Sequence, residues 1–404
     1  MTLTPAYDRQ GATVYCGDAL DVLRELPDAS VNCVVTSPPY WGLRAYGTEP
    51  QVWGGWACGS VEETGEHEWG AETNVGLGKG HTAYAGDSRT RWQNPVRAGE
   101  SAIEFGKASL GQHCLCGAWR GELGSEPTIE MFVEHMVEIF SEVKRVLDAR
   151  GVMFLNLADS YAGSGKGPSE SLNKANGHSQ GINSAAVPIG LKPKDLCGIP
   201  WRVVLALQAD GWYWRSTIVW AKKSPMPESV RDRPTSAWEP VFLLSKSERY
   251  HYDADAVRES AIYGRSSKTN GAAGMYGRVR EADPRDQREN PRGATTGFNP
   301  SAGRNQRNVW LLGPDPEPAA HFATFPRELV RRCVLAGCPE GGVLLDPFVG
   351  SGRSAEVAVA LGRRAIGIDL NLDYLQTIAI TRNQQLGMLS HDSPPSDLSG
   401  PVRI

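Results

Sequence analysis

A strand, a glycine-rich turn, a helix and a second strand follow one another within residues 343–369. The turn reads Asp-Pro-Phe-Val-Gly-Ser-Gly (Asp346–Gly352), and the second strand ends on an acid, Asp369, nineteen residues after Gly350. Two strands joined through a helix lie parallel in one sheet, and the helix packs on a face of that sheet. This unit therefore predicts an open α/β sheet.

The rest of the chain repeats this alternation. Apolar runs typical of buried strands lie at residues 12–15, 31–36, 152–157, 214–220 and 241–244, in addition to 343–345 and 364–368. Helical spacing or helix start signals lie at residues 19–26, 130–150, 200–209, 326–336 and 354–361, and Gly151 is expected to end the second of these helices. Seven strands alternating with helices predict a mostly parallel sheet with helices on both faces.

The glycine-rich turn and Asp369 follow the logic of a nucleotide site. Glycines let a ligand approach the backbone, and an acid at the tip of the next strand accepts hydrogen bonds from ribose hydroxyls. The fingerprint Gly-x-Gly-x-x-Gly is absent from this turn, which disfavours a pyrophosphate cofactor. Taken alone, the turn is equally consistent with a tight strand–helix connection and a surface acid.

A second motif, Thr36-Ser37-Pro38-Pro39-Tyr40, follows the predicted strand 31–36. The exocyclic amine of a base is a poor nucleophile because its lone pair is delocalised into the ring. Ser37 Oγ and the Pro38 carbonyl could accept the amino hydrogens, the two prolines stiffen the turn, and Tyr40 offers a stacking face for a base taken out of the duplex. Taken alone, the motif is more simply a strand ended by a Pro-Pro turn.

Together, the two motifs and their order resemble the DNA amino-methyltransferases, in the permuted class that carries the catalytic motif first and the cofactor motif last. The resemblance covers most of the chain outside two irregular insertions. It implies a Rossmann-like methyltransferase sheet of seven mostly parallel strands. The matching stretches are GDAL (17–20), TSPPYWGLR (36–44), LNLADSY (155–161), WEPVFLL (238–244), RNVW (307–310), HFATFP (321–326), DPFVGSG (346–352) and GIDL (367–370).

The resemblance also implies a role for each matching position. The cofactor is S-adenosylmethionine; Asp369 would bind its ribose, Asp18 its adenine, and His321 with Phe322 would close over the methyl donor. The methionine part would be held by the turn residues Asp346, Phe348, Gly350, Ser351 and Gly352. Ser37, Pro38, Pro39 and Tyr40 would hold the target base.

Serine at position 37 is similar to the cytosine-N4 members of the family, whereas aspartate there is more typical of adenine-N6 enzymes. Cytosine N4 is therefore the expected target, and adenine N6 is the alternative. An RNA or small-molecule methyltransferase and a catalytically silent DNA-binding module are further alternatives, which the intact motifs disfavour. Val349 and Arg353-Ser354 depart from the commoner residues of the family, and this puts only loop details in doubt.

The first insertion, residues 47–125, has no sustained period and no evident core. A zinc ion bound by Cys58, His67, Cys116 and either Cys114 or His113 is one way to fold such a stretch. The alternative is a set of free thiols, and the Cys-x-Cys spacing leaves the two interpretations evenly balanced.

The second insertion is the most basic part of the chain. Residues 258–307 carry ten basic and five acidic side chains, a net charge of +5 in a chain whose net charge is −4. This asymmetry predicts a target-recognition region that contacts DNA phosphates.

Six regions are expected. They are a catalytic half (1–46), the insertion (47–125), a continued methyltransferase domain (126–253), a target-recognition region (254–315), a cofactor-binding half (316–388) and a disordered tail (389–404). No apolar run reaches membrane-spanning length and no signal peptide is recognised, so we expect a cytoplasmic protein whose eight cysteines are thiols or metal ligands. Double-stranded DNA is the expected substrate and a restriction endonuclease a candidate partner; a monomer and a homodimer are both open.

Overall fold

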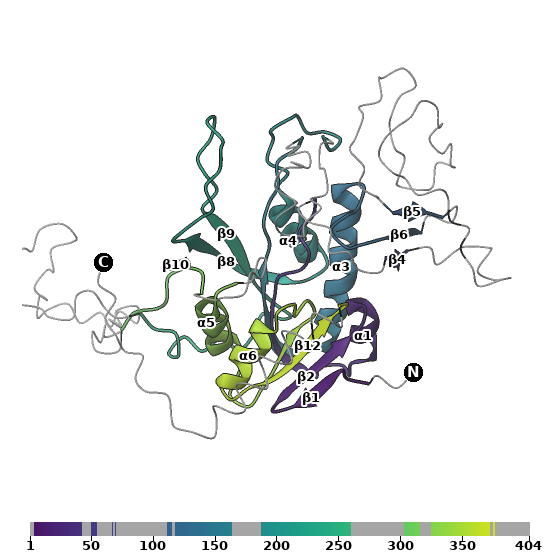
Figure 1. The fold of residues 1–404 in the computed structure, drawn as a ribbon. Helices are drawn as coiled ribbons and strands as arrows, with labels where there is room; N and C mark the ends of the chain where they lie inside the picture. Colours follow the sequence, from purple (N-terminus) through teal and green to yellow (C-terminus); the bar gives the residue numbers. More distant parts are fainter. Residues whose placement is uncertain are drawn as a thin grey trace, which may run out of the picture.

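The computed structural model describes residues 4–42, 50–54, 67, 69, 111–114, 118–163, 187–259, 303–315, 325–371 and 375. Its centre is a nine-stranded sheet in the order β1-β2-β12-β11-β3-β7-β9-β8-β10 (Figure 1). The strands are β1 (Tyr7–Arg9), β2 (Ala12–Cys16), β3 (Val31–Thr36), β7 (Leu147–Asn156), β8 (Tyr213–Lys222), β9 (Trp238–Ser245), β10 (Val309–Leu312), β11 (Val343–Asp346) and β12 (Arg364–Asp369).

Helices cover both faces of this sheet. One face packs against α1 (Ala19–Glu25), α3 (Ile129–Val146) and α4 (Ile199–Ala209), and the other against α5 (Arg327–Gly337) and α6 (Arg353–Ala360). Successive strand residues serve opposite faces: Val34 lies in the first core, and its neighbours Cys33 and Val35 lie in the second. None of the helices in the described ranges is long and apolar enough to cross a membrane.

The predicted α/β sheet is confirmed, but with two more strands than expected. β1 pairs antiparallel with β2, and β10 pairs parallel with β8, at the two edges of the sheet. β1 is three residues long and mostly exposed, and the four apolar residues of β10 alternate between exposed and buried positions, so neither is buried on both faces like a central strand. The pairs β1–β2, β7–β9 and β8–β9 are antiparallel and the other five neighbouring pairs are parallel, as a mostly parallel sheet requires.

The end of α3 differs from the prediction. Thr128 caps its N-terminus through a hydrogen bond from the Met131 N–H. The helix ends at Val146, however, because Leu147 is extended and pairs with Val31 of β3. The expected stop at Gly151 is therefore wrong. Gly151 lies inside β7, where a side chain would meet Leu147 at 2.5 Å.

The described part of the first insertion forms a small sheet that packs on α3. β4 (Gln51–Trp53), β5 (Gln112–His113) and β6 (Trp119–Gly121) form a three-stranded antiparallel sheet separate from the main one. Trp53 stacks on His135 of α3 with ring centroids 4.4 Å apart, and Trp119 lies on the same ring at 5.5 Å. The expectation of a stretch without a core is thus corrected: two tryptophans attach it to α3.

Candidate active site

The two sequence motifs meet at the carboxyl ends of neighbouring strands. β3 and β11 are adjacent and parallel, with Leu344 beside Cys33 and Leu345 beside Val34. The last residue of β3, Thr36, donates a hydrogen bond of 2.7 Å from its hydroxyl to Asp346 Oδ1, the last residue of β11. Ligands of open α/β sheets bind at this edge. The motifs, 310 positions apart, therefore belong to one site.

Asp346 faces the protein interior. Besides Thr36, its carboxylate accepts hydrogen bonds from the Ser354 hydroxyl at 2.6 Å and from the Phe348 N–H at 3.1 Å. Burial raises the pKa of Asp346 to about 6, while these hydrogen bonds act in the opposite direction. Its described contacts hold the turn in place. Direct contact between this side chain and a cofactor stays a prediction.

The turn itself depends on glycine. Gly350 and Gly352 have φ of 48° and 73°, in the left-handed region that other residues rarely adopt. Gly352 is also the N-cap of α6, so the loop passes directly into the helix. The Val349 N–H donates to the Ile368 carbonyl at 2.9 Å, and the Gly350 N–H donates to Asp369 Oδ2 at 3.0 Å. These bonds attach the loop to the end of β12.

Two acids lie at the tips of adjacent strands beside this loop. Asp369 ends β12, where its Oδ1 accepts from the Asn371 N–H at 2.9 Å. Asp18 follows β2 and caps α1 by accepting from the Leu20 and Asp21 N–H groups. The Gly17 N–H donates to the Asp369 carbonyl at 3.0 Å and holds the two tips together. Burial raises the pKa of both carboxyls.

The Ser-Pro-Pro-Tyr turn lies beside these residues, and hydrogen bonds of the Tyr40 hydroxyl hold it in place. The Tyr40 hydroxyl lies 2.9 Å from Asn156 Oδ1 and 3.2 Å from Glu239 Oε2, and it accepts a hydrogen bond of 3.0 Å from Ser37 Oγ. On the other side, Gly124 has φ of 91°, and a Cβ there would lie 3.2 Å from Pro39. The close approach of the 118–126 segment to the turn therefore requires a glycine.

The sequence of the chain matches a family of known function. A family model described as DNA methylase, N6_N4_Mtase, matches residues 31–380. The chain belongs to this family. The type II methyltransferase M.Cfr9I of Citrobacter freundii is 36% identical to this methylase. The match covers 93% of the present chain and 88% of M.Cfr9I. The type II methyltransferase M.SmaI of Serratia marcescens is 32% identical, and the match covers 89% of the present chain and 87% of M.SmaI. The family resemblance carried by the two motifs is confirmed.

A solved structure shares the fold of this methylase. It is titled PvuII DNA methyltransferase (cytosine-N4-specific), and the match has a TM-score of 0.52 and covers 95% of this chain and 89% of that chain. The two sequences are 13% identical, so the likeness concerns the fold alone. It confirms the predicted methyltransferase sheet.

Several functional candidates of the methylase were not predicted as site residues. Asn156 and Glu239 contact the Tyr40 hydroxyl, and both belong to stretches that carry the family resemblance, LNLADSY and WEPVFLL. The signal was present, but a role for either residue needs the pairing of β7 with β9, which brings Asn156 opposite Val241. His321 and Phe322, expected to close over the methyl donor, lie outside the described residues.

The predicted zinc ligands are described only in part. Cys58 and Cys116 lie outside the described residues. Trp69 forms an antiparallel bridge with Cys114, and the rings of His67 and Trp69 are 4.9 Å apart, so two parts of the insertion meet. No group of three potential ligands occurs within the described ranges. Zinc binding stays a prediction.

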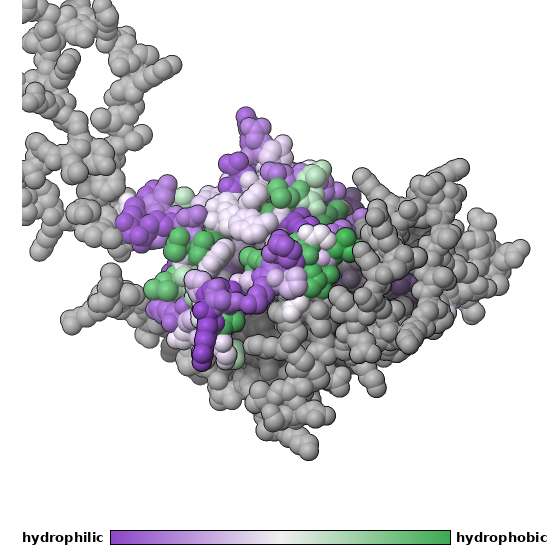
Figure 2. Space-filling model, turned by 90° about the horizontal axis from the view of Figure 1, so that it is seen from above, coloured by the Kyte–Doolittle hydropathy of each residue, from purple (hydrophilic) through white to green (hydrophobic). Residues whose placement is uncertain are grey.

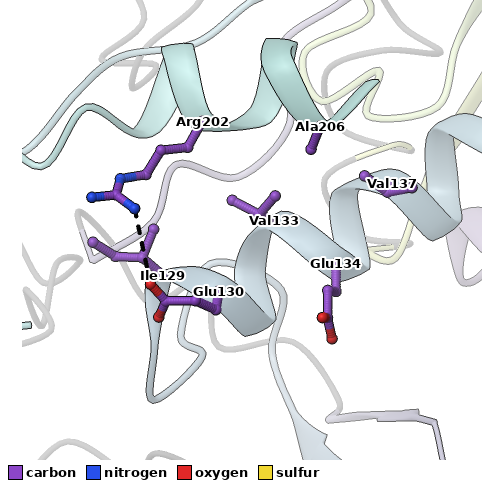
Figure 3. A pocket seen from close by; sticks show the side chains of 7 residues that line it. All are labelled: Ile129, Glu130, Val133, Glu134, Val137, Arg202 and Ala206. Atoms are coloured by element: carbon purple, nitrogen blue, oxygen red, sulfur yellow. Dashed lines mark ion pairs between the residues drawn. The ribbon is translucent and has the colours of Figure 1, made fainter. Parts of the chain in front are cut away.

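A groove lies between α3 and α4 (Figure 3). It has a volume of about 410 Å³, and Arg202 pairs with Glu130 across it at 3.9 Å. None of its lining residues belongs to either motif. Seen from above, the described part of the molecule shows hydrophilic and hydrophobic side chains interspersed (Figure 2).

Proposed function

We propose that this methylase transfers a methyl group from S-adenosylmethionine to the exocyclic N4 amino group of cytosine in double-stranded DNA. The hydrogen bond between Thr36 and Asp346 carries the proposal, because it places Ser37 next to the glycine-rich loop. A donor held by that loop and an amino group held by Ser37 would share one edge of the sheet. Such proximity replaces an encounter of two molecules by a positioned reaction.

The residues at the loop fit S-adenosylmethionine chemically. Asp369 offers a carboxylate at the tip of β12 that would accept from the ribose hydroxyls, and Asp18 at the adjacent tip of β2 would contact the adenine. The backbone of residues 348–352 would hold the methionine part. When bound, the cofactor supplies an electrophilic methyl group. The chain's own residues only position it.

Ser37 and Pro38 would act on the target amine. Hydrogen bonds from the amino group to Ser37 Oγ and to the Pro38 carbonyl would draw its hydrogens out of the ring plane and return the lone pair to nitrogen. The base must leave the duplex to reach them, and the Tyr40 ring offers a stacking partner. Serine at position 37 supports cytosine N4 over adenine N6, which is the alternative for the same site.

Two substitutions separate the roles within this site. In Ser37→Ala, the rate of transfer at saturating cofactor should fall while the dissociation constant for S-adenosylmethionine, measured by calorimetry, stays unchanged. In Asp369→Ala, that constant should rise about tenfold or more, because hydrogen bonds to a charged acceptor are lost. Equal loss of cofactor affinity in both variants would assign the serine turn to the cofactor and contradict the proposal.

Other partners remain proposals. A restriction endonuclease that cuts the same DNA sequence is the candidate protein partner. The basic residues within 254–315 are the candidate contacts to DNA. Of these, Arg304 and Arg307 both pair with Glu259, at 3.0 and 2.8 Å, which joins the two ends of the region. Residues 260–302 lie outside the described part of the chain.

A further inference from the structure

We propose that Glu239 determines which group donates in each bond of a chain of hydrogen bonds. The chain runs from Glu239 through Asn156 and Tyr40 to Ser37. In this chain Ser37 is compelled to donate its proton inward, so its lone pairs face the target amino group. The inference rests on the proposed function and assigns positioning roles to three residues behind the serine. The chain orients protons and forms no covalent bond.

The direction starts from two acceptors that cannot donate. Asn156 Nδ2 lies 3.1 Å from the Pro240 carbonyl and 3.2 Å from Glu239 Oε2. A carbonyl is always an acceptor, and a carboxylate is an acceptor when ionised. If the Asn156 amide were turned over, its oxygen would face both of these oxygens without a proton between them. Because Asn156 is 2% exposed, no solvent would relieve that repulsion.

Lys222 forms an ion pair with Glu239. Its Nζ contacts Glu239 Oε1, so one carboxylate oxygen is held by a cation while Oε2 faces Asn156 and Tyr40. The Glu239 side chain is 14% exposed, and the pair sits where β8 and β9 lie side by side. With Oε1 engaged by the lysine ammonium, Oε2 is the acceptor that faces Asn156 and Tyr40.

The fixed amide of Asn156 in turn fixes the Tyr40 hydroxyl. Asn156 Oδ1 faces that hydroxyl at 2.9 Å and Glu239 Oε2 faces it at 3.2 Å, and both are acceptors. The single hydroxyl proton of Tyr40 is therefore directed to this pair. The tyrosine oxygen can only accept from its other side.

Ser37 stands on that other side. Its Oγ lies 3.0 Å from the Tyr40 oxygen, which has no second proton to give, so Ser37 must be the donor. No other hydrogen bond of Ser37 Oγ is formed with the described residues. Its lone pairs are thereby presented outward as acceptors for an amino group. A serine with a free rotor could equally present its proton, which would oppose an N–H donor.

The experiment measures single-turnover methyl transfer to a cytosine-containing duplex with saturating S-adenosylmethionine. Tyr40→Phe keeps the ring but frees the Ser37 proton, and Glu239→Gln introduces a donor that faces the Asn156 amide. Each variant should slow transfer by about tenfold, the factor for one hydrogen bond of ordinary strength. Binding of S-adenosylmethionine, measured by calorimetry, and thermal unfolding should stay near wild type. Glu328→Gln, which changes an exposed ion pair on α5, is the matched control and should keep the wild-type rate.

The double variant gives the decisive comparison. Once Tyr40→Phe has broken the chain, adding Glu239→Gln should slow transfer by less than about twofold more, because both changes act through the same contact. Independent losses that multiply to about a hundredfold would contradict the proposed chain of hydrogen bonds. A wild-type rate in Tyr40→Phe, or a loss confined to cofactor binding, would also contradict it. If the wild-type protein transferred no methyl group to cytosine, this result would instead overturn the proposed function, and with it the proposed chain of hydrogen bonds.

Discussion

At the scale of single residues, Asp346 has the contacts that join the two halves of the site. Its buried carboxylate receives hydrogen bonds from Thr36 on the catalytic strand and from Ser354 on α6. Burial raises the pKa of Asp346 to about 6, whereas an exposed aspartate has a value of about 4. The protonated form therefore favours the folded state. This contribution is present at low pH and is lost as the pH rises through about 6.

Asp346→Asn tests this linkage because asparagine has a similar shape and does not titrate. Between about pH 4 and pH 7, the free energy of unfolding of the wild type should fall relative to that of the variant by up to about 3 kcal/mol. Urea unfolding of both proteins across this range measures the difference. Parallel pH profiles would contradict the raised pKa.

At the scale of elements, the sequence was most informative where strands are buried on both faces. Buried apolar residues mark β3 and β11, and the Pro-Pro pair and the glycine turn mark where these two strands end. β1 and β10 gave a weaker signal because they are short edge strands: β1 has one apolar residue, and the four apolar residues of β10 alternate between exposed and buried positions. The end of α3 depends on Leu147 pairing with Val31, a contact distant in sequence that local spacing does not contain.

Site residues could be predicted where they end a strand that the sequence itself reveals. Ser37, Asp346 and Asp369 each follow a recognisable strand within a motif, and the structure brings all three to one edge. Asn156 and Glu239 lie in stretches that match the family, but nothing in those stretches assigns either residue to the site. Their position behind Tyr40 follows only from the antiparallel pairing of β7 with β9.

The first insertion carries the metal prediction. Purified protein should contain about one zinc per chain, as a closed structural site requires, and Cys116→Ser should lower that content. Cys16→Ser, which changes an exposed thiol at the end of β2, is the control and should keep the metal. Folded, active protein without zinc would leave the cysteines of the insertion as free thiols.

At the scale of the whole molecule, charge is unevenly distributed. The chain has a net charge of −4, yet residues 258–307 carry +5. A local basic segment can bind DNA in an acidic protein, since the attraction to phosphates falls off within about 10 Å at ordinary ionic strength. We therefore expect the DNA duplex to be held mainly through this segment.

Neutralising Arg278, Arg280 and Arg285 together measures that contribution. Each phosphate contact contributes roughly 0.9 to the slope of log affinity against log salt, so the slope should flatten by up to about 2.7. Replacing Arg331 and Arg332, which Glu328 holds on α5, is the control and should leave the slope unchanged. An unchanged slope in the triple variant would indicate a merely solvated segment, and altered sequence preference at constant slope would indicate base readout.

The identity of the methylated nucleoside tests the central claim most directly. Genomic DNA is incubated with the protein and S-adenosylmethionine carrying an isotopically labelled methyl group, then digested to nucleosides and separated by mass. The architecture around Ser37 predicts that the label appears in N4-methylcytosine and that Ser37→Ala strongly reduces it. Label in N6-methyladenine would contradict the cytosine assignment, and DNA without label would contradict methyl transfer itself.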